Sequence, residues 1–89
     1  MIHLADMMLN RPYPDSGELL FNDMYPLLME GKRIDIDLSG VVSLPSMFLN
    51  ASIGRASKEF GTDKVKHCIV FYHITKSQAD RLREYFDRI

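Results

Sequence analysis

The sequence contains one cysteine, Cys68, and no long apolar run. A single thiol cannot form an internal disulfide, and the Cys pairs of a structural zinc site or a CxxC redox centre are missing. The longest uncharged apolar run, Cys68 to Tyr72, is far shorter than the roughly 20 residues that span a bilayer. Because the start has Asp6 and no apolar stretch, we expect no secretory signal. We therefore expect a cytoplasmic domain without a membrane partner, stabilised by packing alone.

The chain also lacks an excess of charge of either sign. Eleven Lys and Arg residues against 12 Asp and Glu residues give a formal net charge of −1, and no run of like charges occurs. Phosphate neutralisation supplies most of the affinity of a duplex-binding domain, which therefore usually has a clear basic excess. A nucleic-acid partner is not expected.

The length of 89 residues leaves no room for two hydrophobic cores. Hydrophobic residues make up 46% and charged residues 26% of the chain, which is typical of a globular domain and too apolar for a disordered tail. The sequence predicts a single domain over residues 1–89, with nearly every large apolar side chain needed for its core.

The first third of the chain predicts a short strand and then a helix. Alternating apolar residues within Ile2–Met8 hint at an opening strand. Asp15 is a good N-cap, and Glu18 follows three residues later as in a capping box. Apolar residues then recur at helical spacing up to Gly31, a natural residue after a helix end. Pro26 lies inside this helix and should bend or divide it.

The middle of the chain predicts a strand, a turn and a second helix. Isoleucine and aspartate alternate in Arg33–Leu38, which is typical of a strand buried on one face only. Ser39–Gly40 should turn the chain. Pro45 and Ser46 then fit the start of a helix that ends at Gly61, with Ser46 able to cap it.

The last third predicts another strand and another helix. His67–Tyr72 is apolar without alternation, which is typical of a central strand or one covered on both faces. Thr75–Gln78 fits a capping box for the final helix, on which Glu84 and Arg88 can pair. The alternating order of strands and helices predicts an α/β fold, a parallel or mixed sheet of three to four strands with about three helices packed on it.

Two neighbouring aspartates are candidates for a reactive site. Asp35 and Asp37 lie on one face of the predicted strand, and Asp37 is at its carboxyl end, where open α/β sheets bind ligands. They could bind a cation or a phosphoryl group, or they could simply face solvent, with Asp37 accepting bonds from the turn that follows. No metal site is complete, no cofactor is expected, and Cys68 is expected in the core. The enzymatic alternative is a small hydrolase or phosphoryl-transfer enzyme using Asp37 with Ser46 and His73.

Hydroxyl groups gather between the second strand and the second helix, at Ser39, Ser43 and Ser46. A serine at a helix start can accept a phosphate, because the helix dipole and free N–H groups stabilise negative charge there. Alternatively, Ser46 is only the N-cap, a role worth about 1 kcal/mol.

Five segments carry a family resemblance: Ser16–Glu18, Pro26–Leu28, Ile34–Val41, Pro45–Asn50 and Ile53–Arg55. Together they resemble the bacterial STAS-like domains of unknown function. That group is similar in turn to the STAS domains of anti-sigma-factor antagonists, in which a kinase-like anti-sigma factor phosphorylates a serine at the helix start and so breaks the complex. Aligned on Ile53–Arg55, Ser46 matches the first serine of their motif, and Met47 takes the place of the phosphorylated one.

The resemblance implies a regulatory module that is not an enzyme. Its partner would be a signalling protein, such as a histidine-kinase-like ATPase, bound through Ser43, Ser46, Met47 and Asn50. The antagonist switch cannot act at Met47, which leaves Ser46 as a candidate phosphorylation site. A homodimer through the Ile34 strand or an apolar helix face is a further possibility.

Overall fold

The computed structural model describes residues 1–89 and contains one parallel sheet. Its strands are β1 (Ile2–His3), β2 (Ile34–Asp37) and β3 (Ile69–Tyr72), in the order β1-β2-β3. In β2 the isoleucines are fully buried, whereas the aspartates between them are partly exposed. The predicted α/β class, the parallel sheet and the one-faced strand are therefore confirmed.

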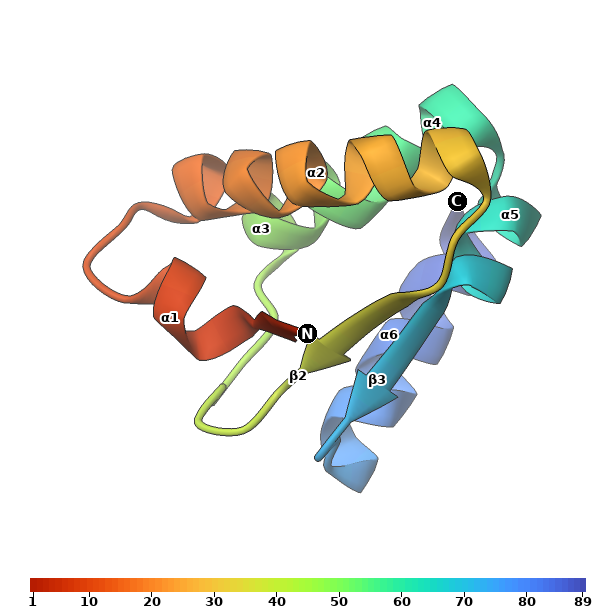
Figure 1. Ribbon diagram of the computed structural model, residues 1–89. Coiled ribbons are helices and arrows are strands. Elements are labelled where there is room, and N and C mark those ends of the chain that lie inside the picture. Colours follow the sequence, from red (N-terminus) through yellow and green to blue (C-terminus); the bar gives the residue numbers. More distant parts are fainter.

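The helices lie around this sheet as Figure 1 shows, with α6 behind β3 in that view. Residues 46–60 form one continuous helix, called helix 46–60 below, which consists of three consecutive segments. Its middle segment, η1 (Asn50–Gly54), has π-helical hydrogen bonding. The helical segments are α1 (Leu4–Met8), α2 (Tyr13–Glu30), α3 (Ser46–Leu49), η1 (Asn50–Gly54), α4 (Arg55–Phe60), α5 (Thr62–Cys68) and α6 (Lys76–Arg88).

The start and the middle of α2 differ from the prediction. The helix begins at Tyr13, with Pro12 as N-cap and another proline in its first turn, so the capping box predicted at Asp15 is wrong. Prolines have the helical φ already set, which starts the helix earlier. Pro26 does not divide α2, which is one helix to Glu30. Pro26 and Asn22 lie on its exposed side, where water can bind the Asn22 carbonyl that lacks a partner.

The region before β3 also differs from the prediction. Residues 62–68 form α5, which periodicity did not reveal, and Cys68 is a buried residue at its end. β3 is an edge strand whose residues after Ile69 are only partly buried, so the prediction of a central or doubly covered strand is wrong. The centre belongs to β2, because β1 pairs on its other side. The predicted opening strand is only two residues long and runs into α1.

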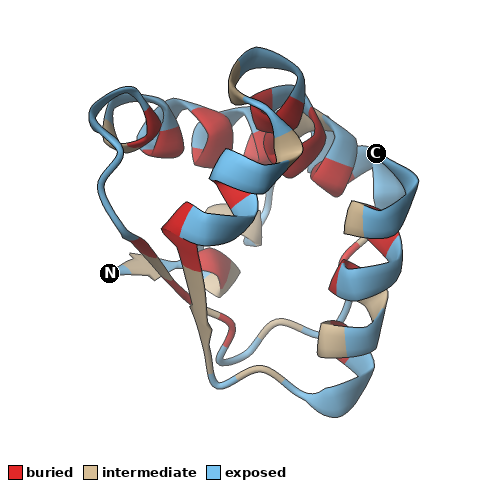
Figure 2. Ribbon diagram, turned by 90° about the vertical axis from the view of Figure 1, so that its right-hand side faces the viewer, coloured by how far each residue is buried: buried red, intermediate tan, exposed pale blue.

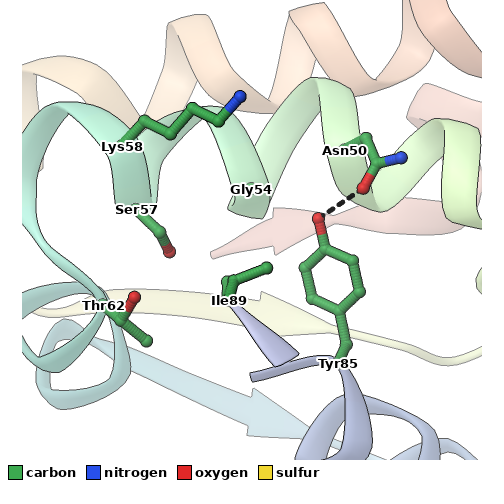
Figure 3. A pocket seen from close by; sticks show the side chains of 7 residues that line it. All are labelled: Asn50, Gly54, Ser57, Lys58, Thr62, Tyr85 and Ile89. Carbon is green, nitrogen blue, oxygen red and sulfur yellow. Dashed lines mark hydrogen bonds between the residues drawn. The ribbon is translucent and has the colours of Figure 1, made fainter. Parts of the chain in front are cut away.

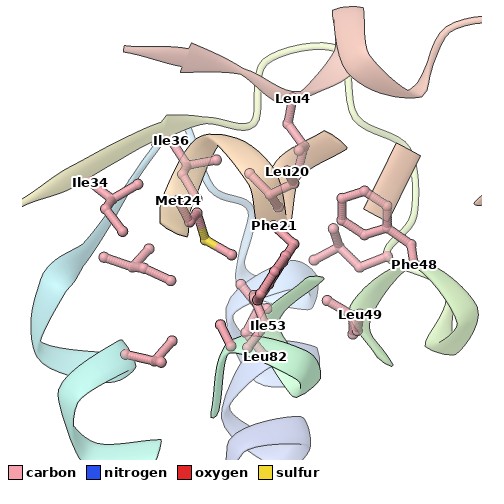
Figure 4. Packing of buried hydrophobic residues seen from close by; sticks show 14 of the residues in the cluster. Leu4, Leu20, Phe21, Met24, Ile34, Ile36, Phe48, Leu49, Ile53 and Leu82 are labelled. Carbon is pink, nitrogen blue, oxygen red and sulfur yellow. The ribbon is translucent and has the colours of Figure 1, made fainter. Parts of the chain in front are cut away.

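One core joins β2, α2, helix 46–60 and α6. Figure 4 shows Met24 beside Ile36 in one part of this core and Ile53 beside Leu82 in another. Figure 2 shows buried residues along the inner sides of the helices. Helix α2 approaches helix 46–60 closely at Gly17, where a Cβ would lie 2.6 Å from that of Ala51. No helix combines the length and the apolar character that crossing a membrane requires.

Candidate functional site

Asp37 ends the central strand and gathers three polar groups around its carboxylate. Oδ1 accepts the Ser39 backbone N–H at 2.9 Å and lies 2.9 Å from His73 Nδ1. Oδ2 lies 3.2 Å from His3 Nδ1. Parallel pairing brings this about, since His3 pairs with Asp37 in register and β3 ends beside it. The predicted bond from the Ser39–Gly40 turn is confirmed, and the two histidines, 70 positions apart in the chain, are an addition that sequence reasoning missed.

This carboxylate is held in its charged form. The Ser39 backbone N–H, and after it the His73 side chain, hold the pKa of the Asp37 carboxyl well below its usual range. Each imidazole can donate to a carboxylate only when its Nδ1 carries a proton. His73 has φ of 55°, an uncommon value for a residue with a side chain, and its bond to Asp37 helps to hold that conformation.

Asp35 has separate partners on the same face of β2. Its carboxylate pairs with Arg33 at 2.9 Å and accepts the Tyr72 hydroxyl at 3.1 Å. The two aspartates are therefore each bound to other side chains, and no group of three His, Cys, Asp or Glu residues is arranged to hold a metal ion. Their geometry fits the interpretation of solvent-side carboxylates better than that of a cation or phosphoryl site.

The loop between β2 and helix 46–60 is attached to α6 by two polar side chains. Gln78 Nε2 donates to the Val41 carbonyl at 2.8 Å, and Arg81 Nε donates to the Leu44 carbonyl at 3.2 Å. Leu44 is itself buried in the core. Gln78 also completes the predicted capping box with Thr75, which is confirmed in both directions. The loop is thus held to α6 at two points, the carbonyls of Val41 and Leu44.

Ser46 is the first residue of helix 46–60, and Pro45 is its N-cap. The interpretation of Ser46 as the capping residue is therefore wrong, because its hydroxyl makes no cap bond. Instead, Ser46 Oγ accepts a 2.8 Å hydrogen bond from Arg81 Nη2. Pro45 supplies the extended conformation that an N-cap needs. The Ser46 hydroxyl is therefore not needed as a cap and bonds to α6 instead.

The four residues expected to bind a partner are all exposed. Met47 is 60% exposed although it is apolar, and Asn50, one turn further on, accepts the Tyr85 hydroxyl at 2.7 Å. Ser43 lies in the fixed loop and lines a hollow of about 310 Å³ together with Arg81. Ser43, Ser46, Met47 and Asn50 form what we call the contact surface.

The residues of the enzymatic alternative do not come together as one site. Asp37 contacts His73, but the Ser46 hydroxyl is bonded to Arg81 and to neither of them. None of the four hollows of the structure is lined by Asp37 or His73. A substrate would have no concave site beside this pair.

Sequence reasoning missed the contacts of three α6 side chains. These are Arg81, Tyr85 and Gln78, the last in its hydrogen bond to the Val41 carbonyl. Their spacing of three and four residues is a signal, because it places them on the helix face that also carries Leu82. The Glu84–Arg88 pair on the outer face is confirmed at 3.4 Å.

The homodimer through the Ile34 strand is not compatible with this arrangement. β2 pairs with a strand on each edge, and Ile34 is fully buried. A homodimer through another face of the domain stays a prediction.

Comparison with known proteins identifies the family. A family profile described as a STAS-like domain of unknown function matches residues 16–85, which includes β2, helix 46–60, β3 and most of α6. No curated protein and no solved structure shows a significant match to the chain. The matched segment holds the contact surface and the α6 side chains that position it. The chain belongs to the family of STAS-like domains of unknown function.

Proposed function

We propose that this STAS-like domain is a non-enzymatic regulatory module that binds a protein partner through the contact surface. The observation that carries the proposal is the 60% exposure of Met47 on the first turn of a helix whose preceding loop is fixed in place. Methionine is flexible and polarizable and adapts to the shape of a partner. A surface that is already ordered loses little conformational entropy on binding.

The partner class follows from the family resemblance. Domains of the similar antagonist group bind kinase-like ATPases through the same loop and helix start, so we propose a histidine-kinase-like ATPase or another signalling protein. The surface residues Ser43, Ser46 and Asn50 are uncharged and flank Met47 in sequence. Such a polar rim around an apolar centre is typical of protein interfaces.

Phosphorylation of Ser46 is part of the proposal. Its hydroxyl lies 2.8 Å from Arg81 Nη2, so a phosphate there would meet a guanidinium, which binds phosphate oxygens well. The added charge would lie beside Met47 and oppose an apolar contact. Incubation with ATP and extract of the source cell, followed by mass spectrometry, tests this step; unmodified Ser46 in a preparation in which the kinase phosphorylates its known substrates would contradict it.

A pull-down from the source cell tests the surface itself. Wild type is compared with Met47→Asp and with the matched control Met29→Asp, which changes a methionine that is 61% exposed on α2. We expect wild type and Met29→Asp to retain the same specific protein and Met47→Asp to lose it. Equal recovery by all three would show that the contact surface is not the interface.

A further inference from the structure

The largest hollow of the structure lies away from the β2 edge, between helix 46–60 and the end of α6. Its volume is about 610 Å³, enough for a small organic molecule. Figure 3 shows the side chains that line it: Asn50, Gly54, Ser57, Lys58, Thr62, Tyr85 and Ile89.

Ser57 brings an unused hydrogen-bonding group to this hollow. The residue is only 8% exposed, and its hydroxyl is the one buried side-chain polar atom without a partner. Ser52, one and a half turns earlier, donates to the Phe48 carbonyl at 2.8 Å as buried helical serines commonly do. The Ser57 hydroxyl instead points into the hollow, toward Ile89 (Figure 3). Unpartnered buried hydroxyls are rare, and a bound ligand is one explanation for them.

Two further donors face the same space. The Thr62 hydroxyl, on the first residue of α5, points toward Ser57 in Figure 3 and makes no hydrogen bond within the protein. Lys58 also lines the hollow and has no carboxylate within ion-pair distance; its side chain extends away from Ser57 and Thr62 in Figure 3, so its flexible stem would have to turn toward them to meet a ligand there. No Asp or Glu lines the hollow. The unused groups are therefore two hydroxyls, which can donate or accept, and one cation, and it is the cation that favours an anion.

The opposite wall is apolar and well fixed. The Tyr85 hydroxyl is bonded to Asn50 and lies over Gly54, where any Cβ would collide with it. Burial raises the pKa of Tyr85, so the phenol stays neutral. The ring of Tyr85 and the side chain of Ile89 provide an apolar surface beside the donors. The π-helical turn that holds Asn50 and Gly54 is of a kind often found at functional sites.

We propose that this hollow is a binding site for a small organic carboxylate. The carboxylate would pair with Lys58 and accept hydrogen bonds from Ser57 and Thr62, and its apolar body would lie against Tyr85 and Ile89. One cation and a largely apolar wall suit a monoanion with an apolar body better than a doubly charged phosphate.

Titration of the whole domain with benzoate, followed by amide NMR shifts at constant ionic strength, tests the site. We expect saturable millimolar shifts that centre on Gly54, Ser57, Thr62 and the end of α6. Benzamide, of the same shape without charge, should bind much more weakly. Inorganic phosphate should not compete with benzoate. The test needs no partner protein, so its result is independent of the proposal for the contact surface.

Two variants locate the binding groups. Ser57→Ala should weaken benzoate binding by about 10-fold, the effect of losing a hydrogen bond to a charged group. Lys58→Gln should weaken it by about 2- to 5-fold. Lys32→Gln changes an exposed lysine outside the hollow and should have no effect. No saturable shifts, shifts that centre elsewhere, or equal binding of benzamide and benzoate would overturn the proposal, as would unchanged affinity in Ser57→Ala.

Discussion

Arg81 Nη2 donates a 2.8 Å hydrogen bond to the Ser46 hydroxyl, across 35 residues of sequence. The same side chain donates through Nε to the Leu44 carbonyl. One guanidinium thus joins the last helix to both the loop after β2 and the start of helix 46–60. Among the side chains of α6, Arg81 alone makes a hydrogen bond to Ser46, so this end of the contact surface depends on it, whereas Tyr85 holds Asn50 at the other end.

Replacement of Arg81 should loosen that surface. Arg81→Ala removes two hydrogen bonds from the loop and helix start, and we expect a loss of about 1–2 kcal/mol in the free energy of unfolding. Amide hydrogen exchange should become faster at residues 42–47 and stay unchanged in α2. Arg83→Ala is the control, because Arg83 pairs only with Asp80 on the exposed face. Equal protection of residues 42–47 in wild type and Arg81→Ala would contradict the role given to Arg81.

The two buried serines of helix 46–60 should respond differently to alanine, with Ser57→Ala stabilising the domain and Ser52→Ala changing its stability little. Ser57→Ala removes an unpartnered hydroxyl and gains helix propensity, so we expect stabilisation by about 1 kcal/mol. Ser52→Ala loses its bond to the Phe48 carbonyl, which offsets the same gain in propensity. Urea unfolding of the two variants beside wild type measures the difference. Destabilisation by Ser57→Ala would show that its hydroxyl has a partner in solution.

Asp37 should make the free energy of unfolding depend on pH, with a loss of stability in acid. The hydrogen bonds that Asp37 accepts hold its pKa below the unfolded value, so it contributes stability that is fully present above the unfolded pKa of about 3.9. That contribution is lost as the pH falls through the folded pKa. Asp37→Asn should therefore be less stable than wild type at pH values above the unfolded pKa, and the difference should shrink in acid.

Thermal unfolding of Asp37→Asn and wild type, from neutral pH down into acid below the unfolded pKa, checks this prediction. Asp87→Asn, at an exposed residue without a hydrogen bond, is the control and should differ little from wild type at any pH. A gap between Asp37→Asn and wild type that stays constant into strong acid would mean that Asp37 contributes through packing and not through its charge.

Gly54 and Tyr85 should be coupled. A Cβ at Gly54 collides with the Tyr85 hydroxyl, so Gly54→Ala should cost about 1–3 kcal/mol through overpacking. In the Tyr85→Phe background the hydroxyl is gone and the added methyl should cost less. A double-mutant cycle by urea unfolding measures this coupling. Additive effects of the two substitutions would place the Tyr85 hydroxyl away from Gly54.

The elements with strong local signals could be predicted from the sequence. The alternation of isoleucine and aspartate in β2 gives a one-faced strand wherever the strand lies, and Thr75 caps α6 through bonds that span three residues. The exposure of Met47 and Asn50 was also expected from their place at a helix start. By contrast, α5 has no clear apolar period, so the sequence does not predict this helix.

The sequence by itself determined a small α/β domain without internal disulfides: the alternation of strand and helix patterns predicts the class, and the single cysteine excludes an internal disulfide. Only the tertiary structure decided which side chains meet. His3, Asp37 and His73 converge because three parallel strands end at one edge, and Arg81 reaches Ser46 because α6 packs beside helix 46–60. The physical reason is that periodicity reports on neighbours within a turn or a pleat, whereas these contacts depend on the order of strands and the packing of helices.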